Sequence, residues 1–207
     1  MPKPVQRAAL GAFALFALMG LGAFTAWTSD FRPGSSGRDG IGGPFALIAA
    51  DGTVVTDRAF RGQWLLVYFG YTHCPDICPT TLLAISQVLR KLGPESAAVR
   101  PIFISLDPER DKPEDVDEFV RSFDPDIIGL TGKASEVAAV ARQYRVFYKK
   151  IPAENSSDYF LNHSSYVYLM GPNGQYVTLF SRDQMDRPEE VAARLRELLG
   201  HPSRIGS

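Results

Sequence analysis

The sequence predicts an α/β fold in which helices flank a mixed central β-sheet. The uninterrupted apolar run over residues 64–71 has the composition of a strand that is buried on both faces, and residues 99–106 form a second, mainly apolar run that is also expected to be a buried strand. Amphipathic helical stripes alternate with these runs along the chain. Near the C-terminus, Asn173-Gly174 is a favoured turn pair and predicts a hairpin. Strands that alternate with helices and end in a hairpin combine parallel and antiparallel pairs in one sheet.

The expected elements follow from apolar periodicity and turn residues. A short N-terminal hairpin surrounds Asp51-Gly52, and the last amphipathic helix has Pro188 at its start and Gly200 at its end. The full expected order is 45–48 and 54–55 (hairpin), 64–71 (strand), 80–92 (helix), 99–106 (strand), 113–123 (helix), 127–130 (strand), 134–144 (helix), 146–148 (strand piece), 166–170 and 176–180 (hairpin) and 187–199 (helix).

An uncharged apolar segment over residues 8–29 predicts a membrane anchor. Its length of about 22 residues is enough for one transmembrane helix across a hydrocarbon core of roughly 30 Å. Because Lys3 and Arg7 precede the segment and Asp30 follows it, the positive-inside rule places the N-terminus in the cytoplasm. A cleaved signal peptide is one alternative, although the apolar region of a typical signal peptide spans only about 7–15 residues and is shorter than this segment. A buried core helix is the other.

The chain is therefore expected to divide into three parts. Residues 1–30 form the N-terminal membrane anchor, and residues 31–43, which are rich in Gly, Ser and Pro, form a flexible linker. Residues 44–207 form one domain. The expected location is a bacterial inner membrane crossed once, with the N-terminus cytoplasmic and the C-terminal domain periplasmic.

Charge and cysteine content narrow the classes of function. The 22 Lys and Arg residues nearly balance 23 Asp and Glu residues, giving a formal charge of −1, and no basic run is present. This distribution argues against nucleic-acid binding. With only two cysteines, a disulfide-dense scaffold and a four-cysteine zinc site are excluded.

The two cysteines, Cys74 and Cys78, lie between a buried strand and the start of a helix. Residues i and i+4 share one helical face, and the unpaired N–H groups at a helix start favour thiolate. A structural disulfide is one interpretation, but closing so small a loop stabilises a fold little. The carboxyl end of a central strand is where α/β proteins place their sites, which favours a functional pair.

The functional alternatives are redox chemistry and metal binding. A redox dithiol usually has Cys-x-x-Cys spacing, which is one residue shorter than this pair, whereas two thiolates suit a soft ion such as Cu(I). His163 precedes the expected strand 166–170 and can face the loop that follows strand 64–71, so it is the candidate third donor. His73 adjoins the first cysteine and is expected to be solvated or to lie behind the donors. His201 lies in the C-terminal tail.

Three separated segments resemble the signature of the Sco/SenC copper-chaperone family: Tyr71–Pro79, Ile104–Asp111 and Asn162–Ser164. The resemblance spans essentially the whole domain after the linker. It implies a thioredoxin-like fold and a role in assembling the binuclear copper centre of cytochrome c oxidase. It also implies that Cys74, Cys78 and His163 bind copper, as Cu(I) or Cu(II). The implied partners are the copper-centre subunit of the oxidase and other periplasmic copper carriers.

Two rival functions use the same residues. In the first, the chain is a membrane-tethered metallochaperone, a binding protein rather than an enzyme. In the second, it is a periplasmic thiol–disulfide oxidoreductase that uses the Cys74/Cys78 pair, and the two activities can operate in sequence. His163 distinguishes them, because only copper transfer requires it. A peroxidase of the peroxiredoxin or glutathione-peroxidase type lacks a matching constellation of residues.

The sequence also suggests roles for several residues near the expected site. Asp107 and Asp111 follow a buried strand, where they can tune the site or dock a partner, or form a turn and a helix cap. Three aromatic residues of the first buried strand are expected to pack in the core: Tyr68, Phe69 and Tyr71. Three others fit either a docking surface or the core: Phe147, Tyr148 and Tyr159.

Overall fold

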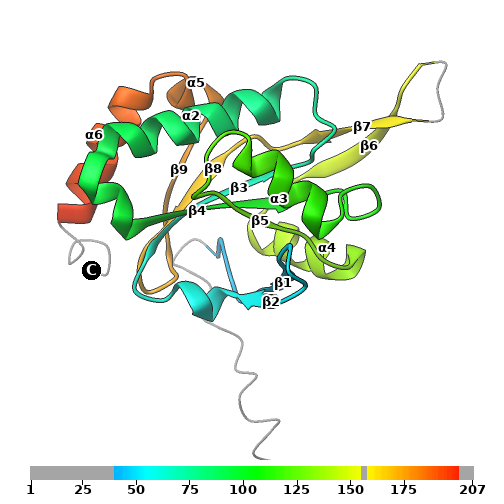
Figure 1. Cartoon of the computed structure of the whole chain (residues 1–207), viewed down its shortest axis with the longest axis horizontal. Helices are drawn as coiled ribbons and strands as arrows, with labels where there is room; N and C mark the ends of the chain where they lie inside the picture. Colours follow the sequence, from blue (N-terminus) through cyan, green and yellow to red (C-terminus); the bar gives the residue numbers. More distant parts are fainter. Residues whose placement is uncertain (1–39, 155–157, 201–207) are drawn as a thin grey trace, which may run out of the picture. The chain divides into compact units, whose positions relative to one another are not determined.

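A mixed five-stranded sheet forms the centre of the computed structural model, which describes residues 40–154 and 158–200 (Figure 1). The strand order is β5-β4-β3-β8-β9. Strand β3 is parallel to β4 and antiparallel to β8, so the predicted mixed sheet is confirmed. The strands are β3 (Trp64–Gly70), β4 (Val99–Ser105), β5 (Ile128–Leu130), β8 (Val167–Met170) and β9 (Tyr176–Phe180).

Helices cover both faces of this sheet (Figure 1). Helices α2 (Ile77–Leu92), α3 (Pro113–Arg121) and α6 (Pro188–Gly200) lie on one face. Helix α4 (Ala134–Gln143) lies on the other, together with the hairpin of β1 (Ala46–Ile48) and β2 (Val54–Thr56). Three short helical segments complete the described chain: η1 (Asp57–Phe60), η2 (Gly93–Ala98) and α5 (Arg182–Met185).

Strand β3 is central because both of its faces are apolar and every one of its residues is buried. Tyr68 packs on the ring of Phe103 on the α2 face, with ring centroids 5.9 Å apart. Phe69 points to the opposite face, where its ring lies 5.2 Å from that of Tyr144. Burying one such side chain contributes about 1.5–3 kcal/mol, so this run holds the two layers together.

Helix α2 begins earlier than expected, at Ile77 rather than at Thr80. Pro79 therefore lies in the first helical turn instead of in the preceding loop. Proline is tolerated there because the N–H that it lacks has no partner within the helix. The shift places Cys78 in the helix itself, with Asp76 as the N-cap residue.

A second hairpin was not expected from the sequence. Strands β6 (Tyr148–Pro152) and β7 (Tyr159–His163) pair antiparallel to each other and extend away from the central sheet (Figure 1). Only a strand piece over 146–148 was predicted. Four of the five residues of β6 are exposed, so the apolar alternation that marks a half-buried strand is missing.

Some expectations lie outside the described residues. These are the membrane anchor over residues 1–30, residues 31–39 of the linker and the tail that contains His201. Within 40–154 and 158–200, no helix is both long enough and apolar enough for a membrane crossing.

Candidate metal centre

Three strand ends meet at one edge of the central sheet. The carboxyl ends of the parallel strands β3 and β4 lie side by side, with Gly70 opposite Ser105. Strand β8 runs the other way, so its first residue, Val167, lies opposite Tyr68 near the same edge. The segments after β3, after β4 and before β8 are therefore neighbours, although they are far apart in the sequence.

The structure brings Cys74, Cys78 and His163 together at this edge. Their donor atoms all lie within 4.8 Å of one another. The Sγ of Cys78 is 3.5 Å from the Nε2 of His163, and the Cys78 N–H donates a 3.4 Å hydrogen bond to the Sγ of Cys74. Neither cysteine forms a disulfide in the structure. Protein donor atoms lie about 2.0–2.3 Å from a first-row metal ion, so the size of this cluster is close to the size of a coordination site.

The two cysteine sulfurs differ in protonation. The pKa of Cys74 is lowered from 9.0 to about 3, chiefly because the Cys78 thiol donates a hydrogen bond to its sulfur. The backbone N–H groups of Asp76 and Cys78 add to this effect. The pKa of Cys78 is raised by that same hydrogen bond and by burial. At neutral pH the pair therefore consists of one thiolate and one thiol.

His163 is the last residue of β7, rather than part of a loop as the sequence suggested. Its Nδ1 lies 3.0 Å from the carbonyl oxygen of Ser164, which can only accept, so Nδ1 carries the hydrogen and donates. The lone pair of Nε2 is then free to face the sulfurs, as a metal-binding histidine requires. The Tyr71 ring meets the imidazole edge-on at 5.9 Å, and the Tyr68 ring lies 6.4 Å away.

Tyr68 and Tyr71 are buried, as predicted for core residues. Their rings also pack next to the imidazole of His163, a role that was not predicted from the sequence. The sequence signal for this role was their position at the end of the apolar run that leads to Cys74. Burial raises the pKa of Tyr71 to about 12, so its hydroxyl stays protonated beside the thiolate.

His73 does not join the donor cluster. Its side chain is about half exposed, and its Nδ1 lies 3.0 Å from the Thr72 hydroxyl and 3.4 Å from a carboxylate oxygen of Asp111. This fits the expectation of a solvated histidine.

Asp107 and Asp111 are both almost fully buried. The Asp107 carbonyl accepts N–H bonds from Arg110 and Asp111, which is the turn role that the sequence suggested. Both carboxylates also accept hydrogen bonds from other side chains. Asp111 accepts hydrogen bonds from Thr72, and Asp107 accepts one from the hydroxyl of Tyr159.

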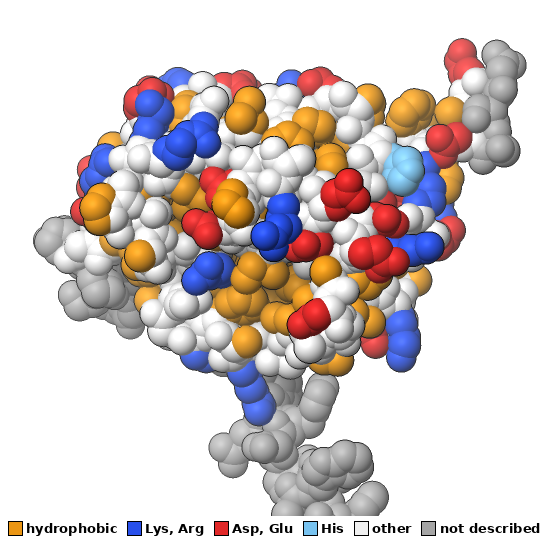
Figure 2. All heavy atoms as spheres, in the orientation of Figure 1, with side chains coloured by type: hydrophobic (Ala, Val, Ile, Leu, Met, Phe, Trp, Pro, Cys, Tyr) orange, Lys and Arg blue, Asp and Glu red, His pale blue; other side chains and the backbone are white. Residues whose placement is uncertain are grey.

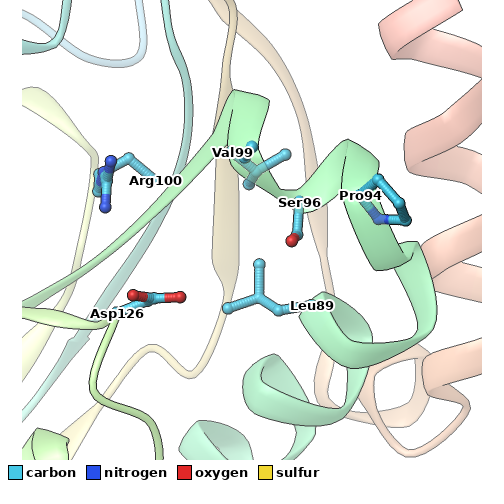
Figure 3. Close-up of a pocket in the computed structure, with 7 residues that line it drawn as sticks. Leu89, Pro94, Ser96, Val99, Arg100 and Asp126 are labelled. Carbon is cyan, nitrogen blue, oxygen red and sulfur yellow. The ribbon is translucent and has the colours of Figure 1, made fainter.

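An open pocket of about 390 Å³ adjoins His163. The exposed rings of Phe147 and Tyr166 help to line it, while Tyr148 and Tyr159 are partly buried against the core. A second pocket of about 380 Å³ lies at the start of β4, and its lining includes Leu89, Arg100 and Asp126 (Figure 3). Among the described residues, no cysteine or histidine lines this second pocket, and it is separate from the donor cluster.

Positive and negative side chains are interspersed over the face drawn in Figure 2. This mixture agrees with the nearly neutral formal charge of −1. Because neither sign dominates this face, it offers no broad electrostatic field to attract a partner.

Comparison with known proteins gives a consistent family relationship. The SCO1/SenC family model matches residues 33–200. "Protein SCO1 homolog 1, mitochondrial" from Arabidopsis thaliana is 46% identical over 150 residues, which is 72% of this chain and 45% of that protein. The human "Protein SCO1 homolog, mitochondrial" is 42% identical over 77% of this chain and 53% of its own length. The chain thus spans about half the length of these curated relatives.

Solved structures agree with this relationship. The structure of Bradyrhizobium japonicum ScoI with copper bound is 46% identical, has a TM-score of 0.70 and covers 76% of this chain and 98% of that chain.

Proposed function

Because the chain belongs to the SCO1/SenC family, we propose that it is a copper metallochaperone that serves cytochrome c oxidase assembly. Copper is its cargo, and the binuclear copper site of the oxidase is the destination. The observation that carries the proposal is the cluster of Cys74, Cys78 and His163 donor atoms within 4.8 Å. The copper in the related Bradyrhizobium japonicum ScoI structure supports it.

The donor set suits both oxidation states of copper. Thiolate sulfurs select Cu(I), and an imidazole nitrogen adds the kind of ligand that Cu(II) accepts. Cys74 is already a thiolate, so the chain offers an anionic sulfur before any ion arrives. His163 is only half-buried, and the pocket beside it is open to solvent. This exposed side is where an acceptor can approach and exchange ligands.

The proposal includes tethering to a bacterial inner membrane by residues 1–30, with the domain over residues 44–207 in the periplasm. The uncharged run over residues 8–29 supports this location. The partners are then the copper-centre subunit of the oxidase and other periplasmic copper carriers.

A second candidate function is thiol–disulfide exchange, and the unequal protonation of the cysteines favours it. In this reaction the Cys74 thiolate attacks a disulfide of an exported protein, forming a mixed disulfide and releasing one target thiolate. The Cys78 thiol then loses its proton and attacks the Cys74 sulfur. The target leaves with two reduced cysteines, and the Cys74–Cys78 pair is oxidised to a disulfide.

Anaerobic copper titration of the full chain tests the proposal. We expect one copper per chain, lost in Cys74→Ser and Cys78→Ser and weakened in His163→Ala. The His73→Ala variant serves as the control, because its ring lies outside the donor cluster. If no stoichiometric copper binds while Cys74 and Cys78 cycle readily with a disulfide substrate, the chaperone proposal fails in favour of the oxidoreductase.

A further inference from the structure

A buried hydrogen-bond network joins the segment that carries the cysteines to the loop after β4. The Asp111 carboxylate accepts hydrogen bonds from the N–H of Thr72 at 3.0 Å and from its hydroxyl at 2.6 Å. It also accepts one from the Ser105 hydroxyl at 2.5 Å, whose oxygen accepts the N–H of Asp107 at 3.0 Å. The loop with Cys74 is thereby fixed to the Asp107 turn.

The same turn holds the hairpin that carries His163. The hydroxyl of Tyr159 donates to one carboxylate oxygen of Asp107 at 2.6 Å, and the Nε of Arg110 donates to the other at 2.6 Å. A terminal nitrogen of Arg110 donates to the Tyr159 carbonyl at 3.1 Å and also binds Asp158. The guanidinium lies over the Tyr159 ring, 3.7 Å from its centroid. We call Asp107, Arg110 and Tyr159 the hairpin clamp.

Strand β7 connects the clamp directly to His163, one of the three metal donors. Tyr159, Leu161 and His163 are alternate residues of this strand, so their side chains share one face. Tyr159 is held by the clamp, Leu161 is buried and His163 reaches Cys78. His163 is four residues after Tyr159, and four strand residues span about 13 Å, so the clamp lies about 13 Å along the strand from the imidazole.

The hairpin needs such an anchor because it lies outside the central sheet. Within the part of the chain that the structure describes, strands β6 and β7 pair only with each other, and the opposite face of the hairpin exposes Ile151 and Phe160 to solvent. Figure 1 shows the two strands extending away from the body of the domain. The position of His163 therefore depends on contacts along the inward face of β7.

We propose that Arg110 and Tyr159 are positioning residues that keep His163 next to the cysteines and so set the relative affinity for Cu(II) and Cu(I). The inference rests on the proposed copper-binding function. Two sulfurs are enough to hold Cu(I), whereas Cu(II) gains from the imidazole nitrogen. Loosening the clamp displaces His163 and leaves the sulfurs in place, so it weakens Cu(II) binding selectively.

The chemistry of Arg110 fits this role better than that of a lysine. Its planar guanidinium packs on the ring and at the same time directs separate N–H groups to Asp107 and to the Tyr159 carbonyl. An ammonium group is a compact charge and cannot reproduce this fork. Arg110→Lys therefore keeps the charge and removes the geometry.

The test compares three variants of the full chain. Arg110→Lys disrupts the fork, and Tyr159→Phe removes only the hydroxyl while retaining the ring. Glu109→Gln is the matched control, because the exposed Glu109–Lys150 ion pair joins the same loop to the same hairpin at 2.6 Å. Exposed ion pairs contribute little, so this variant leaves the hairpin in place. The measurements are Cu(I) and Cu(II) dissociation constants and the thiolate-to-Cu(II) absorption spectrum.

We expect Arg110→Lys to weaken Cu(II) binding by about 10- to 100-fold, the usual effect of losing a group that orients a metal-bound histidine. Tyr159→Phe weakens it less, and both variants shift the Cu(II) spectrum toward that of His163→Ala. Cu(I) affinity stays close to that of the parent chain, as do all properties of Glu109→Gln.

The failures of the two proposals are distinguishable. If the parent chain binds no copper, the proposed function is wrong. If the parent binds both ions, and Arg110→Lys and Tyr159→Phe bind Cu(II) with unchanged affinity and spectrum, the positioning role is wrong. Equal weakening of Cu(I) and Cu(II) also overturns it, because that result means general damage to the site.

Discussion

The two sulfurs at the centre of the site have different surroundings. Cys74 is at the margin of the core and accepts hydrogen bonds from the start of α2, whereas Cys78 lies in the first turn of α2 and is completely buried. The environment therefore lowers the pKa of Cys74 to about 3 and raises that of Cys78. Only Cys78 has a proton left to lose when an ion binds near neutral pH.

This difference predicts the pH dependence of copper binding. Copper binds thiolates, so Cu(I) capture between about pH 7 and pH 9 releases one proton from the pair, because Cys74 has already lost its own. The apparent Cu(I) affinity should then rise about tenfold for each unit of pH increase, and fall equally as pH decreases. Titration against a competing Cu(I) chelator at several pH values measures the slope. A slope of two protons per copper contradicts the assignment of Cys74 as a thiolate.

At the scale of elements, Gly70 sets how closely helix α2, which contains Cys78, approaches the sheet. It ends β3, and a Cβ atom at this position would lie 2.7 Å from the Cys78 sulfur and 2.8 Å from the Phe103 ring. Carbon atoms in folded proteins do not approach that closely, so α2 could not keep its present position above a larger residue. The distance between Cys78 and the sheet thus depends on the absence of a side chain.

Gly70→Ala should therefore affect both stability and the metal site. We expect the free energy of unfolding to fall by about 1–3 kcal/mol from overpacking and copper binding to weaken as Cys78 shifts. Gly129→Ala is the control, since its Cβ would lie 2.9 Å from Val116, away from the donors. Urea unfolding and copper titration of both variants check this. Copper affinity that falls equally in both variants would refute a specific effect through Cys78.

The sequence predicted the central elements well because their signals are local. The apolar runs that became β3 and β4 and the helical stripe that became α2 are buried in the structure as expected. Strand β6 has exposed lysines, and its hairpin is held in part by specific side-chain contacts such as the hydrogen bond from Tyr159 to Asp107. Such contacts leave no periodic signal. Helix α5 was also missed, although Ser181 and Gln184 form a capping box that marks its start.

The site was predictable in composition but not in its supporting contacts. The spacing of Cys74 and Cys78 and the position of His163 before a strand indicated that the three side chains can meet at one sheet edge, and the structure brings them together there. The role of Arg110 was not predicted, although it lies in a segment that the sequence singled out. Its partner Tyr159 is 49 residues away, and no local pattern shows that the two meet.

At the scale of the whole molecule, Asp111 links the sheet to the cysteine loop. Its side chain is fully buried and accepts three hydrogen bonds from Thr72 and Ser105. An uncharged amide cannot accept all three, and a buried donor left without an acceptor costs about 1–3 kcal/mol. The carboxylate therefore contributes to global stability as well as to the shape of the site.

Asp111→Asn should lower the free energy of unfolding by about 2 kcal/mol, because at least one buried donor loses its acceptor. Urea unfolding with intrinsic fluorescence measures the change. Asp117→Asn is the control, since the Asp117–Arg121 pair at 4.0 Å is partly exposed and contributes little. Equal stability of the two variants would show that the Asp111 network has no energetic role.

The arrangement of β3 between β4 and β8 also bears on how the chain folds. Cys74 and Cys78 are four residues apart and come together as soon as α2 forms, whereas His163 is 85 residues from Cys78 and arrives only after β8 has paired with β3. Non-local strand pairing is slow compared with helix formation. During folding, a two-sulfur site suited to Cu(I) therefore precedes the three-donor site.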